Sequence, residues 1–442
     1  MSVPERYAIA VPEITDIWGA KGTFNGQARV WEAHVQARHA LEGSPNFEEF
    51  GLIKNALFLT TEEVTTLNEP RGHETVKLQR LIQAKLPASL RNFIHKGATS
   101  SDVLDTNLAL QALNSLNIYR GDNNKLITAL MSLTLLHKDT IQVGRTHGQH
   151  AIPQTFGRQV LGWYAAVKEG NRRIQQAKDV ISFGKWSGEI GTHAFVSPQL
   201  EEKAMELLGL KPEPTPTQII PRWRHAEVLS NMALNALALE KMAIDIRLLA
   251  LTDIGEVREP FDEHGSSAMP HKRNPELAER ICGLARVTRG AMLEQHEAGA
   301  PWLERDISHS STERITFPVS FATIDYETRL GIQIIKGLVV FQDRMAQNLD
   351  TSRGGIYSAR LLNMLIDRGV DRTEAYDTIK RLAQTAYDEK SNLKKLVTNE
   401  PLIVEKLSKS ELKDAFDPKA YLQNIGVAYQ RMNIDIENLF AD

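Results

Sequence analysis

The sequence is poor in cysteine and has no excess of positive charge. Cys282 is the one cysteine among 442 residues, so the chain can form neither an internal disulfide nor a zinc site built on cysteines. This composition suits a reducing compartment, and we expect a cytoplasmic protein. Lys and Arg number 52 against 55 Asp and Glu, for a formal charge of -3, so no overall basic field favours nucleic acid. An anionic ligand would need a local cluster of cations.

Long uncharged hydrophobic runs are also missing. The most apolar stretch, residues 228–254, is interrupted by charged residues that would be costly at a bilayer centre, including Glu240, Lys241, Asp245 and Arg247. We therefore predict a buried helix and no membrane partner, and the first residues lack the apolar run of a secretory signal. The H-E-x-x-H, G-x-x-x-x-G-K and dinucleotide-binding patterns are absent too, so we expect no metal and no organic cofactor.

What the sequence does contain is helical periodicity, while alternating strand patterns beside hairpin turns are scarce. We predict an all-α protein with long helices over 103–139, 154–181, 226–257, 275–297 and 317–349, packed as a bundle. A helix of about 30 residues spans about 45 Å, so partner subunits are expected to cover part of it. The predicted domains are an N-terminal helical domain (1–98), a central bundle (99–349) and a C-terminal helical domain (350–442).

The connection over residues 265–275, GSSAMPHKRNP, combines small residues, two prolines and a basic cluster. A polar loop before a helix explains that composition. The order of the residues, however, resembles the signature of the fumarase/aspartase superfamily, and alanine before MPHKRNP resembles its adenylosuccinate lyase family. The resemblance implies that Ser266 removes a proton beside a carboxylate and that Ser267 binds substrate. It also implies that Lys272 stabilises the charges that develop and that Asn274 binds a substrate carboxylate.

Elimination also needs an acid for the departing nitrogen, and histidine has the unperturbed pKa nearest neutrality. His147 in GRTHGQHA is our candidate. A single histidine is more often structural, but this segment resembles the lyase branch, in which the matching histidine is the general acid. In the same way, Glu279 is implied to pair with this histidine. Without the resemblance, Glu279 would be interpreted as a solvated carboxylate on a helix.

The segment FIHKGATSSD contains three further candidates before a predicted helix. Helix capping alone explains part of this pattern. The resemblance adds that His95 lies in the active site and that Thr99 and Ser100 bind the succinyl carboxylates. His73 matches a substrate-binding histidine of the family, although Gly72 stands where the family commonly has a basic residue.

Arginines dominate the remaining positions at which the resemblance implies substrate binding. Their forked guanidinium groups suit phosphate oxygens, although salt bridges on a helix surface would also explain several of them. Trp223 replaces an acidic residue that is more usual in the family. The implied substrate-binding residues are Arg6, Tyr7, Gln218, Arg305, Ser310, Arg314, Ser358 and Arg360.

The resemblance runs from residue 6 to about 375. It implies elimination of fumarate from adenylosuccinate to give AMP, and from SAICAR to give AICAR, by a homotetramer with shared active sites. Two alternatives stay open. A sister lyase or cycloisomerase acting on another succinate or muconate derivative would leave Arg6, Arg314 and Arg360 without an anion. The second alternative is a structural or binding protein that keeps the superfamily fold but catalyses no reaction. Such a protein would have no need for the four catalytic candidates, Ser266, Lys272, His147 and Glu279.

Overall fold

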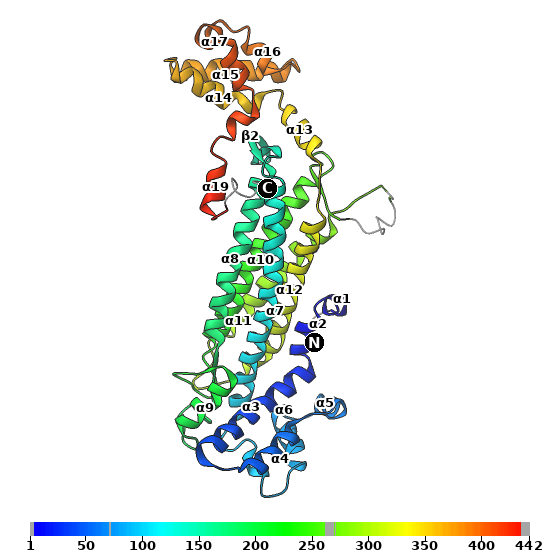
Figure 1. The fold of residues 1–442 in the computed structure, drawn as a ribbon, viewed down its shortest axis with the longest axis vertical. Helices are drawn as coiled ribbons and strands as arrows, with labels where there is room; N and C mark the ends of the chain where they lie inside the picture. The colour runs from blue at the N-terminus through cyan, green and yellow to red at the C-terminus, as the bar shows by residue number, and fades with distance from the viewer. Residues whose placement is uncertain (1–3, 70–71, 261–268, 270, 435–442) are drawn as a thin grey trace, which may run out of the picture. The chain divides into compact units, whose positions relative to one another are not determined.

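The computed structural model describes residues 4–69, 72–260, 269 and 271–434. α-Helix dominates this part of the chain, which confirms the all-α prediction (Figure 1). The described residues also contain six short strands in three two-stranded sheets, which the sequence analysis did not predict. No helix in these ranges is long and apolar enough to cross a membrane.

The chain divides into two compact units, each built from three stretches of sequence. Unit 1 comprises residues 1–125, 167–240 and 280–330, and unit 2 comprises 126–166, 241–279 and 331–442. Their borders fall inside the long helices, so the three predicted domains stay a prediction. The five long helices are α7 (Ser100–Leu136), α8 (Phe156–Ile181), α10 (Trp223–Leu249), α11 (Glu276–Glu297) and α12 (Ser308–Gly337).

Three of the predicted helix boundaries need correction. The helix predicted over 226–257 ends at Leu249, and the chain turns at Gly255, whose φ of 62° lies in the left-handed region that glycine tolerates. The helix predicted over 317–349 begins earlier, at Ser308, and ends at Gly337. Pro318 lies inside this helix. The helix α7 runs without interruption from Ser100 to Leu136.

Unit 1 also holds the N-terminal helices, two of which begin with capping boxes. Asn46 and Glu49 cap α4, and Thr60 and Glu63 cap α5 in the same reciprocal way.

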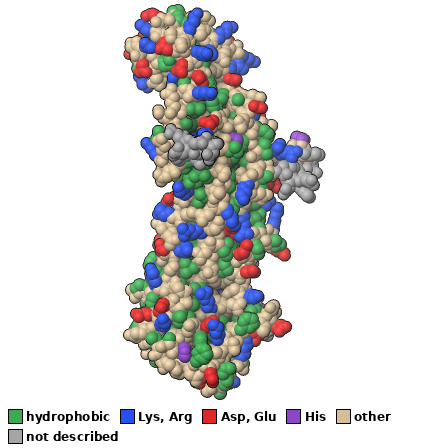
Figure 2. Space-filling model, in the orientation of Figure 1, with side chains coloured by type: hydrophobic (Ala, Val, Ile, Leu, Met, Phe, Trp, Pro, Cys, Tyr) green, Lys and Arg blue, Asp and Glu red, His purple; other side chains and the backbone are tan. Residues whose placement is uncertain are grey.

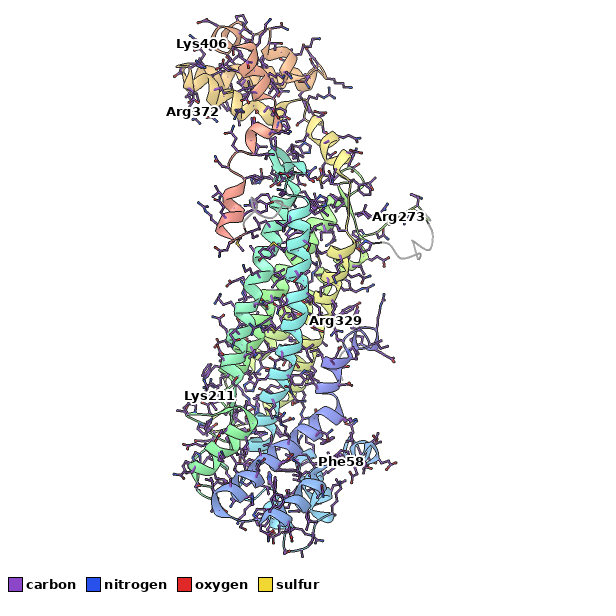
Figure 3. All side chains as sticks on the ribbon, in the orientation of Figure 1. Phe58, Lys211, Arg273, Arg329, Arg372 and Lys406 are labelled. Carbon is purple, nitrogen blue, oxygen red and sulfur yellow. The ribbon has the colours of Figure 1, made fainter. Side chains whose placement is uncertain are left out.

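A cluster of ion pairs around Arg329 also lies in unit 1. Arg329, labelled in Figure 3, donates to Asp122, Asp325 and Glu13, each at 2.9 Å. The additional elements are α1 (Glu5–Ala8), α2 (Pro12–Trp18), α3 (Ala20–Glu42), α4 (Phe47–Leu57), α5 (Thr61–Leu67), α6 (Glu74–Ala84), η1 (Arg91–Phe93), β3 (Phe183–Gly184), α9 (Pro198–Leu208) and β4 (Lys211–Pro212).

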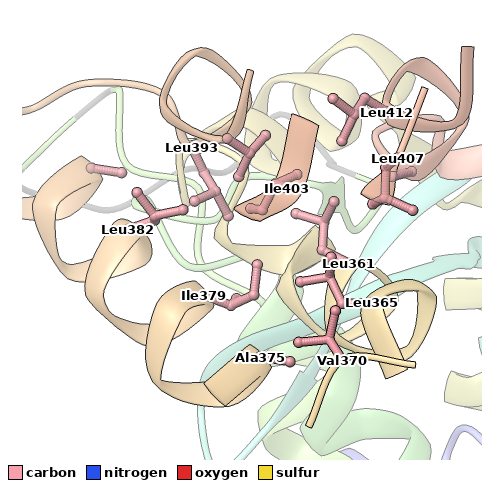
Figure 4. Packing of buried hydrophobic residues seen from close by; sticks show 13 residues of the cluster. Leu361, Leu365, Val370, Ala375, Ile379, Leu382, Leu393, Ile403, Leu407 and Leu412 are labelled. Carbon is pink, nitrogen blue, oxygen red and sulfur yellow. The ribbon is translucent and has the colours of Figure 1, made fainter. Parts of the chain in front are cut away.

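Unit 2 contains two antiparallel strand pairs and a group of short helices. The strands are β1 (Ile141–Thr146) with β2 (Gln149–Thr155), and β5 (Val257–Arg258) with β6 (Val339–Val340). The helices between residues 358 and 415 pack around buried leucine and isoleucine side chains, including Leu361, Leu365 and Ile379 (Figure 4). The short helices of unit 2 are α13 (Gln342–Asp350), η2 (Gly355–Tyr357), α14 (Ser358–Asp367), α15 (Arg372–Asp388), α16 (Leu393–Val397), α17 (Pro401–Lys406), α18 (Lys409–Ala415), η3 (Pro418–Tyr421) and α19 (Gly426–Arg431).

Candidate functional site

A cavity of about 380 Å³ in unit 1 brings several predicted residues together. Arg305, Ser310 and Arg314 all line it. The last two are four residues apart on α12 and therefore share one face of the helix. Gln218 joins the group because its side-chain oxygen accepts a hydrogen bond from Arg305 Nη1 at 2.9 Å. Four of the predicted substrate-binding residues thus form one cluster.

Arg314 is already paired with a carboxylate in this cavity. Its Nη1 and Nη2 donate to the two oxygens of Glu74 at 3.0 and 2.8 Å. Such a two-point geometry is also the way arginine binds phosphate. Glu74 is the first residue of α6 and also lines the cavity, and the exposed His73 precedes it directly. Sequence reasoning missed Glu74, although its place beside His73 was a signal.

The preceding Gly72 explains one departure from the family pattern. Its φ of 81° lies in the left-handed region, where a side chain would be strained. The neighbouring Arg71 lies outside the described residues. Trp223, the other departure, opens α10, and the guanidinium of Arg224 lies 4.5 Å from its ring centre.

Buried charges form part of the wall of the same cavity. Asp105, Arg222, His309 and Glu313 line it, and sequence reasoning identified none of them. Arg222 donates to Glu313 at 3.3 Å and to both oxygens of Asp105. Burial, followed by the charge of Arg222, lowers the pKa of His309 to about 4, so this ring is neutral at pH 7. One available signal was the position of Asp105 within the helix predicted over 103–139, which was expected to pack in a bundle.

His95 has an unusual backbone and a defined tautomer. Its φ is 68°, and its Nδ1 lies 3.3 Å from Nε1 of Trp31. Because the indole N–H can only donate, Nδ1 accepts and Nε2 carries the proton of the neutral ring. Burial, and then the nearby His73, lower the pKa of His95 to about 4.

Thr99 and Ser100 stand at the N-terminus of α7, as predicted. The backbone N–H of Thr99 donates to Asp102 Oδ2 at 2.7 Å, and Ser100 is the first helical residue. The other oxygen of Asp102 accepts hydrogen bonds from Lys185 Nζ and from the Ser187 N–H, and the side chains of Asp102 and Lys185 are fully buried. A helix N-terminus favours negative charge, and the carboxylate of Asp102 supplies a negative group at this one.

His147 lies at the tip of the hairpin between β1 and β2, where its side chain is exposed. His147 and Gly148 have φ values of 54° and 74°, as a two-residue hairpin turn of type I′ requires. Residues other than glycine seldom adopt this conformation, although histidine does so more often than most. Holding such a residue there costs on the order of 1–3 kcal/mol. The hairpin itself was missed because the sequence has His-Gly in place of the usual Asn-Gly or Asp-Gly.

The signature segment is described only in part. Ser266 and Ser267 lie outside the described residues, whereas Lys272, Asn274 and Glu279 line a cavity of about 920 Å³ in unit 2. Arg273, labelled in Figure 3, lines it too. Among the described residues, no hydrogen bond or ion pair joins Glu279 to His147. The pairing of these two residues therefore stays a prediction.

Glu259 is a further residue that sequence reasoning missed. Its two oxygens accept hydrogen bonds from the N–H groups of Leu277 and Ala278, at 3.0 and 2.7 Å. The carboxylate thereby caps the first turn of α11, the helix that carries Glu279. Burial raises the pKa of Glu259 in spite of these hydrogen bonds.

Four predicted residues do not join these clusters. Arg6 is exposed on α1, and the Tyr7 ring lies 5.4 Å from that of Tyr326. Ser358 opens α14. Arg360 pairs with Asp414 and lies 5.7 Å from the ring centre of Tyr421. The charge of Arg360 is therefore partly balanced within unit 2.

The described residues contain no group of three or more His, Cys, Asp or Glu side chains placed to hold a metal.

Known proteins share both the fold and the sequence pattern. A family model described as Lyase matches residues 6–290. The structure of a fumarate lyase from Mesorhizobium sp. BNC1 superposes with a TM-score of 0.87 at 26% identity, covering 97% of this chain and 98% of that one. For the 3-carboxy-cis,cis-muconate lactonizing enzyme of Pseudomonas putida the values are 0.86 and 28%, with 95% and 96% covered. The chain is a lyase of the fumarase/aspartase superfamily.

The particular family follows from closer relatives. Residues 354–432 match a model of the adenylosuccinate lyase C-terminus. The adenylosuccinate lyase of Aquifex aeolicus is 42% identical over 433 residues, which cover 97% of this chain and 98% of that protein. The Bacillus subtilis enzyme is 37% identical over 432 residues, with 97% and 99% covered. The chain belongs to the adenylosuccinate lyase family, whose members are carbon–nitrogen lyases.

Proposed function

We propose that this protein eliminates fumarate from adenylosuccinate to give AMP, and from SAICAR to give AICAR, in purine nucleotide biosynthesis. The observation that carries the proposal is 42% identity with the Aquifex aeolicus adenylosuccinate lyase across 97% of the chain. In the reaction, a base takes a proton from the carbon beside a carboxylate and the C–N bond breaks. The bond electrons pass to the nitrogen, which receives a proton from an acid. The sister-lyase alternative is not favoured, because identity with the muconate lactonizing enzyme of Pseudomonas putida is 28%, against 42% with the Aquifex aeolicus adenylosuccinate lyase.

In this proposal, Ser266 is the base and His147 the acid. A serine hydroxyl is a poor base unless its anion is stabilised, and the ammonium of Lys272 supplies positive charge in the same segment. Asn274 lines the same unit 2 cavity as Lys272 and binds a substrate carboxylate. Glu279 holds the proton and the tautomer of His147, and Ser267 contacts the substrate.

The nucleotide and succinyl ends of the substrate occupy different groups of residues. Arg305, Ser310 and Arg314 in the unit 1 cavity bind the phosphate and sugar, with Gln218 beside them. Thr99 and Ser100 at the start of α7 bind the succinyl carboxylates, with His95 nearby. The same assignment gives Arg6, Tyr7, His73, Ser358 and Arg360 to the nucleotide end.

We also propose a homotetramer with active sites shared between subunits. In unit 1, Leu234 (48%) and Leu237 (52%) of α10 are about half exposed. Their spacing of three residues places them on one face of the helix, and exposed leucines on one helix face are typical of a helix–helix interface. In unit 2, Leu248 of α10 and Leu251 in the turn after it are also half exposed, at 50% each. On the face shown in Figure 2, acidic and basic side chains are interspersed, as suits a small-molecule enzyme without nucleic acid. The free, buried Cys282 suits a cytoplasmic location.

The test is fumarate release from purified protein supplied with adenylosuccinate, followed by absorbance. SAICAR is assayed in parallel, and a carboxymuconate serves as the substrate of the alternative class. Turnover of the two succinyl-nucleotides without turnover of the muconate supports the proposal. A well-folded protein that releases no fumarate from either nucleotide would overturn the substrate assignment. Light scattering of the same sample measures the mass of the assembly, and a monomer contradicts the shared site.

A further inference from the structure

The hairpin that carries His147 is anchored by an arginine two residues before the tip. Arg145 donates from Nη2 to Glu256 Oε1 at 2.6 Å and from Nη1 to Glu256 Oε2 at 3.0 Å. The Glu256 side chain is fully buried, and that of Arg145 is 16% exposed. A two-point ion pair fixes both the distance and the direction of the guanidinium. The strand leading into the turn is therefore held at a defined place.

Glu256 is itself firmly held. Asn348 Nδ2 donates to its Oε1 at 2.7 Å and to the carbonyl of Ile254 at 2.9 Å. The Glu256 backbone donates to the carbonyl of Leu249 and accepts from the N–H of Phe341, at 2.9 and 3.0 Å. The Glu256 carboxylate is thus held between the C-terminal end of α10 and α13. It can therefore fix the position of Arg145 and of the hairpin strand that carries it.

The strand ladder alone leaves the direction of the hairpin tip less well determined. The β1–β2 register shifts between Val143 and Arg145, where one residue of β1, Gly144, stands opposite two residues of β2. The extra residue bends β2 locally and re-aims the part of the hairpin beyond it. Arg145 faces His150 across the sheet, directly beyond the irregularity and before the turn. An anchor at this position sets where the tip points.

We propose that Arg145 is a positioning residue for His147 and acts through its ion pair with Glu256. The inference rests on the role of His147 as general acid in the proposed function. Arg145 moves no proton. It holds the two-residue turn so that the His147 ring reaches the departing nitrogen. Misplacing a catalytic group by about 1 Å can cost on the order of a hundredfold in rate.

A double-mutant cycle separates positioning from general damage. Arg145→Met, His147→Ala and the combined variant are assayed for kcat and KM beside wild type. We expect Arg145→Met to lower kcat by roughly tenfold to a hundredfold, because the acid is displaced, and to leave KM within about twofold. In the His147→Ala background the same change is expected to cost nothing further, because there is no acid left to position.

Two variants sharpen the comparison. Arg145→Lys keeps the charge but lacks the fork, so its kcat is expected between those of wild type and Arg145→Met. Arg172→Met removes an arginine whose pair with Glu169 is exposed, and it should leave kcat unchanged in both backgrounds. Circular dichroism and assembly mass are recorded for every variant. If Arg145→Met does not fold, Glu256→Gln takes its place in the cycle.

The outcomes distinguish this inference from the proposed function. Equal losses of kcat in the wild-type and His147→Ala backgrounds would overturn the role of Arg145 alone, and so would an unchanged kcat for Arg145→Met. Full activity of His147→Ala would overturn the assignment of the acid and this inference with it. A loss confined to the background that contains His147 supports both.

Discussion

Arg222 forms a two-point ion pair with Asp105, in which Nη1 and Nη2 donate to the two carboxylate oxygens at 2.6 and 2.8 Å. Both side chains are at least 95% buried, and both line the unit 1 cavity. Burial by itself raises the pKa of the Asp105 carboxyl, but the charge and hydrogen bonds of Arg222 outweigh it and hold the pKa at about 2. The pair therefore stays ionised at neutral pH and acts as a support for the cavity wall.

Asp105→Asn should destabilise the protein by about 3–5 kcal/mol, because it leaves the buried Arg222 charge with much less compensation. Chemical denaturation followed by circular dichroism at fixed protein concentration measures the change. Glu169→Gln is the matched control, since the pair of Glu169 with Arg172 is exposed, and its cost should stay below about 1 kcal/mol. Equal, small costs for the two variants would contradict a structural role for the buried pair.

The buried His225 predicts a loss of stability in mild acid. Burial, and next the charge of Arg222, lower its pKa from 6.5 to about 3. As the pH falls below 6.5, the unfolded chain takes up a proton at this ring while the folded chain does not. Stability should therefore fall by about 1.4 kcal/mol per pH unit from this group.

His225→Gln removes that titration, so the stability of this variant should depend less steeply on pH between 6.5 and about 5. Denaturation midpoints of wild type and variant, measured at half-unit steps of pH, test the expectation. Parallel curves for His225→Gln and wild type would show that His225 takes up its proton equally in the folded and the unfolded protein, and would contradict the prediction.

The sequence allowed prediction of the long helices, because apolar residues at helical spacing require cover whatever the partner is. It did not allow prediction of the ends of α10 and α12, which depend on local backbone geometry at Gly255 and on the turn before Ser308. The short strand pairs were missed too, since a strand of two residues such as β5 leaves no alternating pattern.

The candidate site residues also differ in how far one sequence predicts them. Candidates within one short motif, such as Ser310 and Arg314, could be proposed from their order, and the structure places both on one cavity wall. The residues that support these motifs could not be proposed from the sequence. Asp105 and Arg222 are 117 positions apart, and Arg145 and Glu256 are 111 apart. Their pairing depends on tertiary packing, which one sequence does not display.

Arg314→Gln should weaken substrate binding more than it slows the chemistry. A hydrogen bond to a charged group contributes about 1.5–3 kcal/mol, so KM for adenylosuccinate is expected to rise by roughly tenfold to a hundredfold, with a smaller change in kcat. The proposed function assigns a two-point contact with the phosphate to the guanidinium of Arg314, and this variant would lose it. In this structure the same guanidinium donates to Glu74. Steady-state kinetics measure both constants.

Arg289→Gln is the control for Arg314→Gln, because Arg289 pairs with Glu240 and is not among the cavity-lining residues. It should leave KM unchanged. A KM for Arg314→Gln within about twofold of wild type would remove Arg314 from the phosphate site.

Ser266→Ala and His147→Ala should each lose at least about a hundredfold in turnover, the scale expected when a general base or acid is removed. Ser266 and His147 are expected to act in one site but to come from different subunits. In that case, the defects of the Ser266→Ala and His147→Ala subunits should complement each other in a mixed tetramer. Mixed tetramers, prepared by co-expressing the two variants with different affinity tags and purifying through both, would contain some sites with an intact Ser266 and an intact His147. Fumarate release by these hybrids is therefore expected to exceed that of either parent variant. Hybrids of confirmed composition that stay as slow as their parents would mean that one chain supplies both residues, and the shared site would have to be abandoned.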